Sequence, residues 1–117
     1  MKTILGTMTF SGQVDIHSAE VMINAYAETK GLELDTAYVY NGGNTEELLG
    51  HLNSQNKLNG MQLAGKANPW VEEGLSPASV EHQLNTSLNR LQMDSIDLFY
   101  LHAPDLNTPI VLSLIHI

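Results

Sequence analysis

The sequence predicts an α/β fold with a parallel sheet built from four strand and helix units. Short apolar runs alternate with segments of helical periodicity, and polar residues lie at or just past the ends of these runs. Strands that alternate with helices are typical of parallel sheets, whose carboxyl-end loops face one side of the molecule. Side chains from distant segments can therefore meet at one point, and the candidates are Asp35, Tyr40, Lys66 and His102.

The first unit begins the chain. Residues 3–5 are expected to form a short strand, and the segment from Gly6 to Gly12 holds two glycines, which indicates a loop. A helix should begin near Asp15 or Ser18, because the apolar residues that follow fall at helical spacing. Gly31 should end this helix, since glycine adopts the left-handed cap conformation without penalty.

The second unit starts with residues 32–34, a predicted strand that ends at Asp35. The segment from Asn41 to Gly43 is typical of a turn. Asn44, with Glu47 three residues later, resembles a capping box at the start of the next helix. The predicted buried stripe of this helix is formed by Leu48, Leu49 and Leu52.

The third and fourth units follow the same pattern. Residues 61–64 predict the third strand, and Ser76 with Pro77 predicts a helix start, because the serine oxygen can accept a free backbone amide and proline has no amide to leave unpaired. Residues 96–101 predict the fourth strand, whose near-continuous apolarity is typical of a sheet covered on both faces. The intervening helix has the clearest amphipathic pattern, carried by Val80, Leu84, Leu88 and Leu91.

Composition excludes several classes of partner. The formal net charge of −8 repels phosphate backbones and anionic membrane surfaces, so we expect neither nucleic acid nor membrane binding. No stretch approaches the roughly 20 apolar residues of a membrane span. We therefore expect a soluble, cytoplasmic protein. Without cysteine the chain has no thiolate metal ligands, and we predict no metal site, since its histidines lie outside metal-ligand spacing: His17, His51, His82 and His116.

Four strings in the sequence carry a resemblance to a known family. They are LGTM at residues 5–8, ELDTAYVY at 33–40, GKANPW at 65–70 and DLFYLHAPD at 97–105. These strings resemble the aldo-keto reductases, and among them the aflatoxin-aldehyde reductase branch, and they occur in the family's order. The resemblance implies a (β/α)8 TIM barrel, which typically needs about 250 residues. A chain of 117 residues supplies roughly the first four units, so we expect a truncated barrel.

The resemblance also implies a reaction, the NADPH-dependent reduction of an aldehyde or ketone. Tyr40 would donate the proton, and Lys66 would favour the charged form of the phenol, as a neighbouring cation does. Asp35 would hold Lys66 in place. His102 would point an N–H at the substrate oxygen, orienting the carbonyl and stabilising the charge that develops on it.

Other assignments stay open at this point. Tyr38 competes with Tyr40 for the phenol role, and only the family spacing selects Tyr40. Trp70 lies on the loop where the family builds its carbonyl pocket, and a substrate contact there is weighed equally with loop packing. Gly6, Thr7 and Met8 would approach the nicotinamide end of the cofactor, and this reading is weighed equally with that of a tight loop. Asp35 is also predicted to bind the cofactor.

The end of the chain departs from the barrel pattern. Residues 1–109 are predicted to be the N-terminal half of an NADP-dependent oxidoreductase, whereas residues 110–117 form an uncharged, β-branched run where the family continues with an acidic amphipathic helix. The final string LSLIHI resembles translated library-adapter sequence. We interpret residues 110–117 as an atypical, non-native tail of a truncated or chimeric transcript, with an authentic alternative end as the other reading.

Two functions follow from these expectations. The longer parent would be an aldehyde and ketone reductase acting on small-molecule carbonyl substrates, and this chain an inactive fragment, because loops after strands seven and eight commonly hold the cofactor phosphates. The alternative is a non-catalytic half-barrel that acts as an assembly or regulatory partner. In either case the open sheet edges invite self-association.

Overall fold

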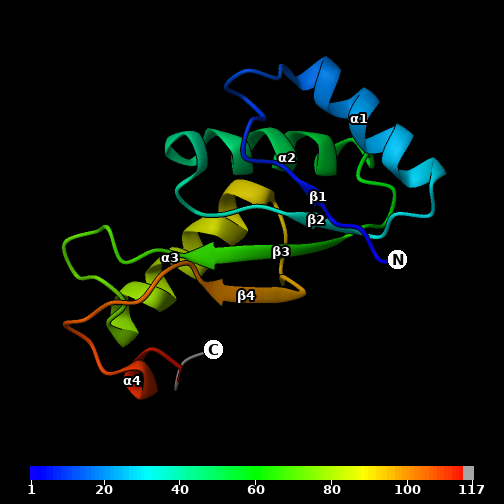
Figure 1. The fold of residues 1–117 in the computed structure, drawn as a ribbon. Coiled ribbons are helices and arrows are strands. Elements are labelled where there is room, and N and C mark those ends of the chain that lie inside the picture. Colours follow the sequence, from blue (N-terminus) through cyan, green and yellow to red (C-terminus); the bar gives the residue numbers. More distant parts are fainter. Residues whose placement is uncertain (115–117) are drawn as a thin grey trace.

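The computed structural model describes residues 1–114, which form a parallel sheet in the order β1-β2-β3-β4 (Figure 1). The strands are β1 (Leu5–Gly6), β2 (Glu33–Asp35), β3 (Gln62–Ala67) and β4 (Leu98–Leu101). The helices are α1 (Ile16–Glu28), α2 (Asn44–Ser54), α3 (Pro77–Leu91) and the short α4 (Ile110–Leu114), with the 3-10 helix η1 (Tyr40–Gly43) before α2. The predicted α/β class and the order of the units are confirmed.

Two helices begin where the sequence predicts. Asp15 caps α1, because its carboxylate accepts the backbone N–H of Ser18 at 2.8 Å. Ser76 caps α3 in the same way by accepting the N–H of Ser79, and Pro77 takes the first helical position. Local side-chain chemistry therefore determines both starts.

The predicted start of α2 and the predicted end of α1 each differ by one residue from the structure. Gly43, with a φ of 98°, takes the cap position of α2, so Asn44 lies inside the helix and the predicted capping box does not form. At the end of α1 the left-handed position is taken by Lys30, with a φ of 63°, instead of Gly31. Gly31 is needed for space, because any side chain there would collide with the ring of Tyr26.

The core lies between the helices and one face of the sheet. Leu34 of β2 and Leu63 of β3 point into it and meet the predicted leucine stripe of α2 there. Helix α3 packs on α2 at Gly50, where a side chain would collide with the backbone carbonyl of Arg90. Because of this contact the buried face of α3 is rotated from the predicted stripe: Leu84 and Leu88 are half-buried, and the buried residues are Ser79, Val80, Gln83, Ser87 and Leu91.

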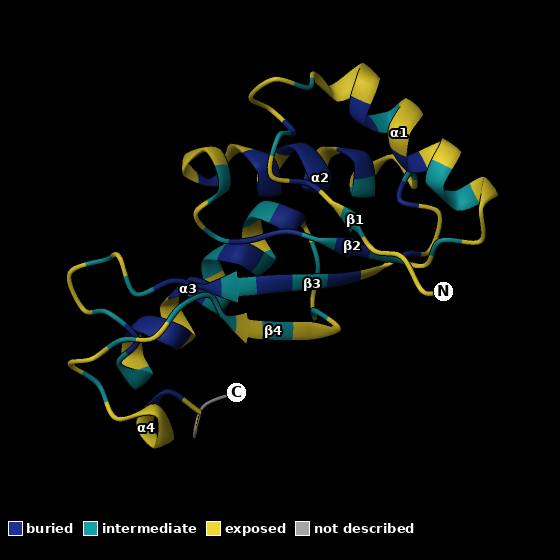
Figure 2. Ribbon diagram, in the orientation of Figure 1, coloured by how far each residue is buried: buried dark blue, intermediate teal, exposed yellow. Residues whose placement is uncertain are grey.

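The opposite face of the sheet is uncovered within the described residues, as the burial colours show (Figure 2). In β4, Phe99 and Leu101 pack towards α3, whereas Leu98 and Tyr100 are 47% and 44% exposed. The expectation that this strand is covered on both faces is therefore wrong. Its apolar side chains alternate between the helical layer and an inner face that a closed barrel would fill.

Several element boundaries also differ from the sequence prediction. Strand β3 continues to Ala67, three residues beyond the predicted end, because it pairs with β4 along its full carboxyl-terminal half. Strand β4 begins at Leu98, since Ile96 packs into the core ahead of it. The segment 110–114 forms the short helix α4 in spite of its β-branched residues, and Ser113 anchors it by donating to the carbonyl of Leu75 at 2.6 Å.

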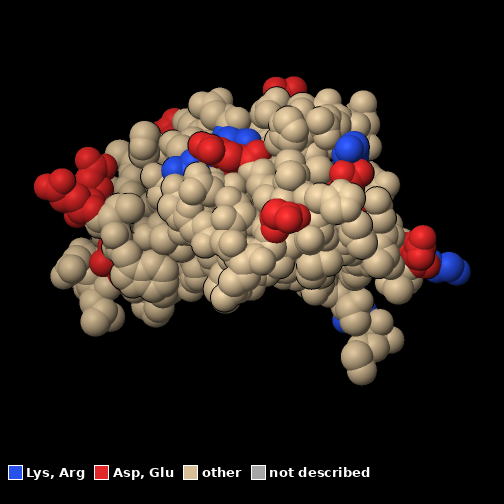
Figure 3. All heavy atoms as spheres, turned by 90° about the horizontal axis from the view of Figure 1, so that it is seen from above, with Lys and Arg blue, Asp and Glu red and all other residues tan. Residues whose placement is uncertain are grey.

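Charges are scattered over the surface. In the space-filling view, Lys, Arg, Asp and Glu form small separate groups on an otherwise uncharged face (Figure 3). In the part of the chain that the structure describes, no helix is long and apolar enough to cross a membrane.

Candidate active site

The carboxyl ends of β2, β3 and β4 bring the predicted polar residues together. Asp35 is the last residue of β2, Lys66 lies one residue before the end of β3, and His102 directly follows β4. Lys66 alternates with Gly65 and Ala67, which face the helical layer, so its side chain lies on the inner face. Parallel pairing aligns these positions from three separate segments at one edge of the sheet.

The Lys66 ammonium is the centre of the cluster. It donates to a carboxylate oxygen of Asp35 at 2.7 Å, to the carbonyl of Thr36 at 2.8 Å and to the hydroxyl of Tyr40 at 3.2 Å. An ammonium has three donors, so these contacts satisfy Lys66 completely. The side chains of Lys66 and Asp35 are only 15% and 31% exposed, and the ion pair is thus shielded in part from water.

His102 completes the cluster from β4. Its backbone N–H donates to the carbonyl of Ala67 at 2.7 Å and extends the strand pairing by one residue. The imidazole ring lies edge-on to Tyr40 with 5.8 Å between the ring centroids, and to Trp70 with 5.2 Å. Its Nδ1 is buried without a hydrogen-bond partner among the described residues. The stacking contacts set the ring plane.

Burial determines the charge of His102. Desolvation lowers the pKa of this imidazole, the nearby Lys66 cation lowers it further, and the Asp35 carboxylate opposes both. A histidine with a pKa below its usual range is neutral at pH 7. The neutral ring carries one N–H, which suits a hydrogen-bond donor to a carbonyl oxygen.

We expect the stability of the chain to fall as the pH drops below about 6.5, with His102 responsible for part of the loss. Because its pKa is lower in the folded state, the unfolded chain binds the proton more readily between the two values. The stabilising contribution is complete above the unfolded pKa and is lost as the pH falls towards the folded one. Denaturant unfolding at neutral and mildly acidic pH measures it. His102→Gln should reduce the loss, and the exposed His82→Gln should not; equal pH profiles for the two variants would contradict this assignment.

Tyr40 owes its position to a tight turn. It opens η1, and Asn41 follows in the left-handed region with a φ of 50°. The Asn41 amide donates to the carbonyls of Met8 and Phe10 at 2.9 Å each, and so ties the loop after β1 to the turn that carries Tyr40. The sequence predicted a turn here but not the bonds from Asn41 to the loop after β1. The asparagine next to Tyr40 was their one local indication.

The structure separates the two candidate phenols. The carbonyl of Tyr38 accepts from the Arg90 guanidinium at 2.9 Å, and the Tyr38 ring lies 4.5 Å from the guanidinium carbon. Tyr40 instead meets Lys66, because the chain turns at residues 38–39, just before η1, and does not keep both phenols on one side. Tyr38 is a packing residue in this geometry.

Arg90 also contacts a buried acid. It donates to Glu46 at 3.2 Å, and Glu46 is completely buried. Desolvation raises the pKa of Glu46, while Ser87 and Arg90 oppose that rise. The sequence did not predict this pair. Glu46 and Arg90 are charged residues on different helices, 44 positions apart, so no local sequence pattern indicates that they meet.

The residues at and after the end of β1 divide into two groups. Thr7 is buried, and its hydroxyl and its backbone N–H both donate to the carbonyl of Asp35, at 2.9 and 3.0 Å, so it braces the acid. Met8 is 62% exposed, and Gly6 faces open space beside Asp35, its partner in the strand register. Their cofactor contacts stay a prediction.

The loop that carries Trp70 is anchored by Asn68 and by Gln83 of α3. The Trp70 backbone N–H donates to the Asn68 side chain at 2.9 Å, and the buried Gln83 of α3 binds the Asn68 backbone at both its N–H and its carbonyl. Trp70 remains 64% exposed, while its ring lies edge-on to His102. This loop is therefore fixed at its base and open at its tip. Gln83 was not predicted, because it occupies a polar position on a buried helix face.

A cleft of about 380 Å³ adjoins His102. Its walls are formed mainly by the segment after β4 and by α4, including Pro104, Ile110 and Ser113. The remaining predicted histidines lie apart from the site: His17 and His82 are exposed, His51 contacts Gln55, and His116 lies outside the described residues. Among residues 1–114, no group of three or more His, Asp and Glu could hold a metal ion.

Comparison with known proteins identifies the family of the chain. Residues 2–116 match the aldo/keto reductase family. The aflatoxin B1 aldehyde reductase member 2 of Homo sapiens is 44% identical over 92% of this chain and 31% of its own length, and a "Probable voltage-gated potassium channel subunit beta" of Oryza sativa subsp. japonica is 31% identical over 88% of this chain and 33% of its own.

The fold agrees as well. A holo-form aldo-keto reductase of Bacillus halodurans superposes with a TM-score of 0.78 at 30% identity, covering 96% of this chain and 39% of that structure. The chain thus spans about a third of the length of these relatives and forms the first four units of their TIM barrel. The separation of residues 110–117 stays a prediction, although the family match continues into them. The chain belongs to the aldo/keto reductase family.

Proposed function

We propose that this chain is the N-terminal half of an NADPH-dependent reductase that converts aldehydes and ketones to alcohols. One observation carries the proposal: the Lys66 ammonium joins the Asp35 carboxylate and the Tyr40 hydroxyl, with the His102 ring against Tyr40. The aldehyde class is supported by the 44% identity to a human aflatoxin B1 aldehyde reductase. A cytoplasmic location stays a prediction.

Each side chain has a defined task in this reaction. Tyr40 donates the proton to the carbonyl oxygen, and Lys66, held by Asp35 at 2.7 Å, stabilises the phenolate that remains. The neutral His102 donates its N–H to the same oxygen and orients the carbonyl. NADPH, when bound, supplies the hydride to the carbonyl carbon. Trp70, at the edge of His102, would cover one side of the substrate.

The residues present fit one end of the cofactor. The open space at Gly6, beside Asp35 and the exposed Met8, would accept a nicotinamide ring near Tyr40. For the phosphates, the described residues offer no comparable cation: of the five basic residues, four pair with acids and Lys30 lies just before the amino end of β2, the end of the sheet opposite the cluster. In this proposal residues 1–114 position the reacting groups but do not supply a cation to bind the cofactor phosphates.

We accordingly expect no NADPH-dependent carbonyl reduction by the 117-residue chain. Tyr40, the proposed proton donor, lies against Lys66, but among the described residues no unpaired cation lies at this end of the sheet, and barrels of this kind commonly bind the phosphates with later loops. NADPH absorbance should stay constant with 2-carboxybenzaldehyde or succinic semialdehyde as substrate. The control is the Tyr40→Phe variant of the same chain. Turnover above that control would show that half a barrel suffices.

A non-catalytic role is the second candidate. The rice relative is named as a channel subunit beta, which supports an assembly or regulatory function for a member of this family. The two candidates differ in what they require of Tyr40: reduction depends on its hydroxyl, whereas a docking role does not. A Tyr40→Phe variant that keeps full biological function would favour the second candidate.

A further inference from the structure

Asparagine is followed directly by glycine at two places in the chain, at Asn41 with Gly42 and at Asn59 with Gly60. Glycine has no Cβ, so its backbone nitrogen approaches a neighbouring group more closely than that of other residues. In this dipeptide the nitrogen can reach the side-chain carbonyl carbon of the asparagine and displace the amide. The two dipeptides are therefore the places where spontaneous deamidation meets the least steric hindrance.

The two dipeptides are matched in backbone shape and in exposure. Asn41 and Asn59 have φ angles of 50° and 56°, and Gly42 and Gly60 have φ angles of 64° and 68°. All four residues are exposed. The first dipeptide lies in η1, and the second lies in the turn before β3. Backbone conformation and access to water are thus similar at both places and do not distinguish them.

Hydrogen bonds do distinguish them, and they restrain Asn41 at both reacting groups. Its amide nitrogen lies 2.9 Å from each of three acceptors, two carbonyls of the loop after β1 and the hydroxyl of the buried Thr45. The Gly42 N–H, which carries the attacking nitrogen, donates to the carbonyl of Val39 at 3.1 Å. The amide that must leave and the nitrogen that must attack are therefore both held.

Asn59 is restrained much less. Its amide donates to one acceptor, the side-chain carbonyl of Asn24 on α1 at 2.9 Å, and this contact is exposed. Among the described residues the Gly60 N–H donates no hydrogen bond, because the turn is closed by the next residue, Met61, whose N–H donates to the carbonyl of Leu58 at 3.1 Å. The attacking nitrogen at this dipeptide is thus free.

We propose that the folded chain deamidates spontaneously at Asn59 and that its hydrogen bonds protect Asn41. The Gly60 nitrogen forms a bond with the side-chain carbonyl carbon of Asn59, and the bond from that carbon to the amide nitrogen breaks. The amide leaves as ammonia, which takes up the proton of the Gly60 N–H. Water then opens the succinimide at either carbonyl and leaves an aspartate or an isoaspartate at position 59. The new carboxylate adds a negative charge to the formal net charge of −8.

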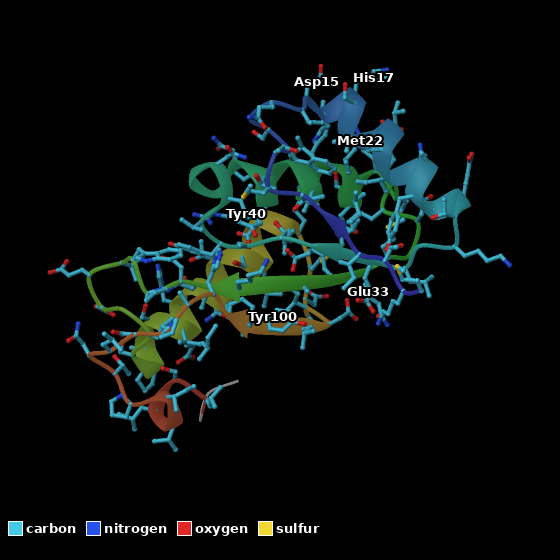
Figure 4. The ribbon with its side chains drawn as sticks, viewed as in Figure 1. Asp15, His17, Met22, Glu33, Tyr40 and Tyr100 are labelled. Carbon is cyan, nitrogen blue, oxygen red and sulfur yellow. The ribbon has the colours of Figure 1, made fainter. Side chains whose placement is uncertain are left out.

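The fold would also accept the product differently at the two positions. The partner of Asn59 is another amide, and Asn24 can turn its side chain to donate to the new carboxylate. The amide of Asn41 faces backbone carbonyls, which have no hydrogen to donate, so a carboxylate there would be repelled. Asn41 follows Tyr40 at the carboxyl end of the strands, whereas Asn59 lies before β3 at the amino end, where Glu33 begins β2 (Figure 4). Deamidation is thus directed away from the candidate active site. The proposal does not depend on the proposed function.

Peptide mapping by mass spectrometry tests the proposal on the 117-residue chain. After incubation in mildly alkaline buffer, trypsin separates the two sites, because residues 58–66 form a peptide with Asn59 as its sole asparagine and residues 31–57 form the peptide that contains Asn41. In the folded chain Asn59 should deamidate at least about tenfold faster than Asn41, since the bonds of Asn41 must open first. In guanidinium chloride the two rates should converge. Equal rates in the folded chain would overturn the proposal, and so would a difference that persists unchanged in the denaturant, because local sequence would then be its cause.

A variant links the protection to the hydrogen bonds. Thr45→Val removes one acceptor of the Asn41 amide and should accelerate deamidation at Asn41 by about two- to tenfold, the effect of losing one such bond, without changing the rate at Asn59. The control is Thr86→Val on α3, which should change neither rate. Circular dichroism establishes that both variants are folded. If folded Thr45→Val deamidated at Asn41 no faster than the control, the proposal would fail; if Thr45→Val did not fold, the comparison of the native chain with and without denaturant would decide.

Discussion

Replacing Tyr40 with phenylalanine in the proposed longer reductase is expected to reduce carbonyl turnover by about 10²–10⁴-fold, the usual contribution of a positioned proton donor. The ring would still fill the space between Lys66 and His102, so we expect NADPH affinity to change little. Steady-state kinetics with an aldehyde substrate, together with fluorescence titration of NADPH, separate the two effects. Lys66→Met should be similarly damaging, since Lys66 holds both the phenol and Asp35.

Tyr38→Phe is the matched control. It removes the same hydroxyl two residues away and keeps the ring that lies on Arg90. Its turnover should remain close to that of the native enzyme. If Tyr40→Phe retained comparable turnover, another acid would have to supply the proton, and the proposed reaction would need a different donor.

Replacing Glu46 with leucine should lower the free energy of unfolding by about 3 kcal/mol, at the lower end of the range for a broken buried ion pair. Glu46 is fully buried, and its removal leaves the Arg90 guanidinium without its carboxylate. The loss is limited because Arg90 keeps its bond to the Tyr38 carbonyl and is 19% exposed. Urea unfolding followed by circular dichroism measures the change.

The neighbouring residue provides the control for this change. Glu47 lies next to Glu46 on α2 but is exposed, so Glu47→Leu should alter stability by no more than about 0.5 kcal/mol. Adding Arg90→Met to Glu46→Leu should recover part of the lost stability, because replacing both partners removes the unpaired charge. Additive losses in the double variant would falsify the view that Glu46 acts mainly through Arg90.

The segment of Tyr38 and Tyr40 shows how far local sequence can reach. The four strings placed Asp35, Tyr40, Lys66 and His102 at strand ends, and the structure brings all four together. The choice between the two phenols, in contrast, depended on the turn at η1 and on Arg90 from another helix. The periodicity of apolar residues indicates which way a side chain points within one helix or strand. It does not indicate where the chain leaves that helix or strand.

The residues that support the site were hidden for the same reason. Asn41, Thr7 and Gln83 each bind backbone groups of segments between 15 and 33 positions away. In the sequence they are ordinary turn, loop and helix residues. Hydrogen bonds of this kind arise only once packing brings the segments within about 3 Å, which no local pattern encodes.

The α/β class, the order of the units, the cap at Ser76 and the leucine stripe of α2 could be predicted from the sequence, because these features depend on propensities and contacts within a few residues. Of the two starts predicted for the first helix, the structure selects the one capped by Asp15. Other features became visible only in the packed molecule. The rotation of α3, the exposure of the inner face at Leu98 and Tyr100, and the helical form of residues 110–114 depend on which surfaces meet. Burial is a property of the assembled layers, and a side chain's partners exist only where distant segments are packed together.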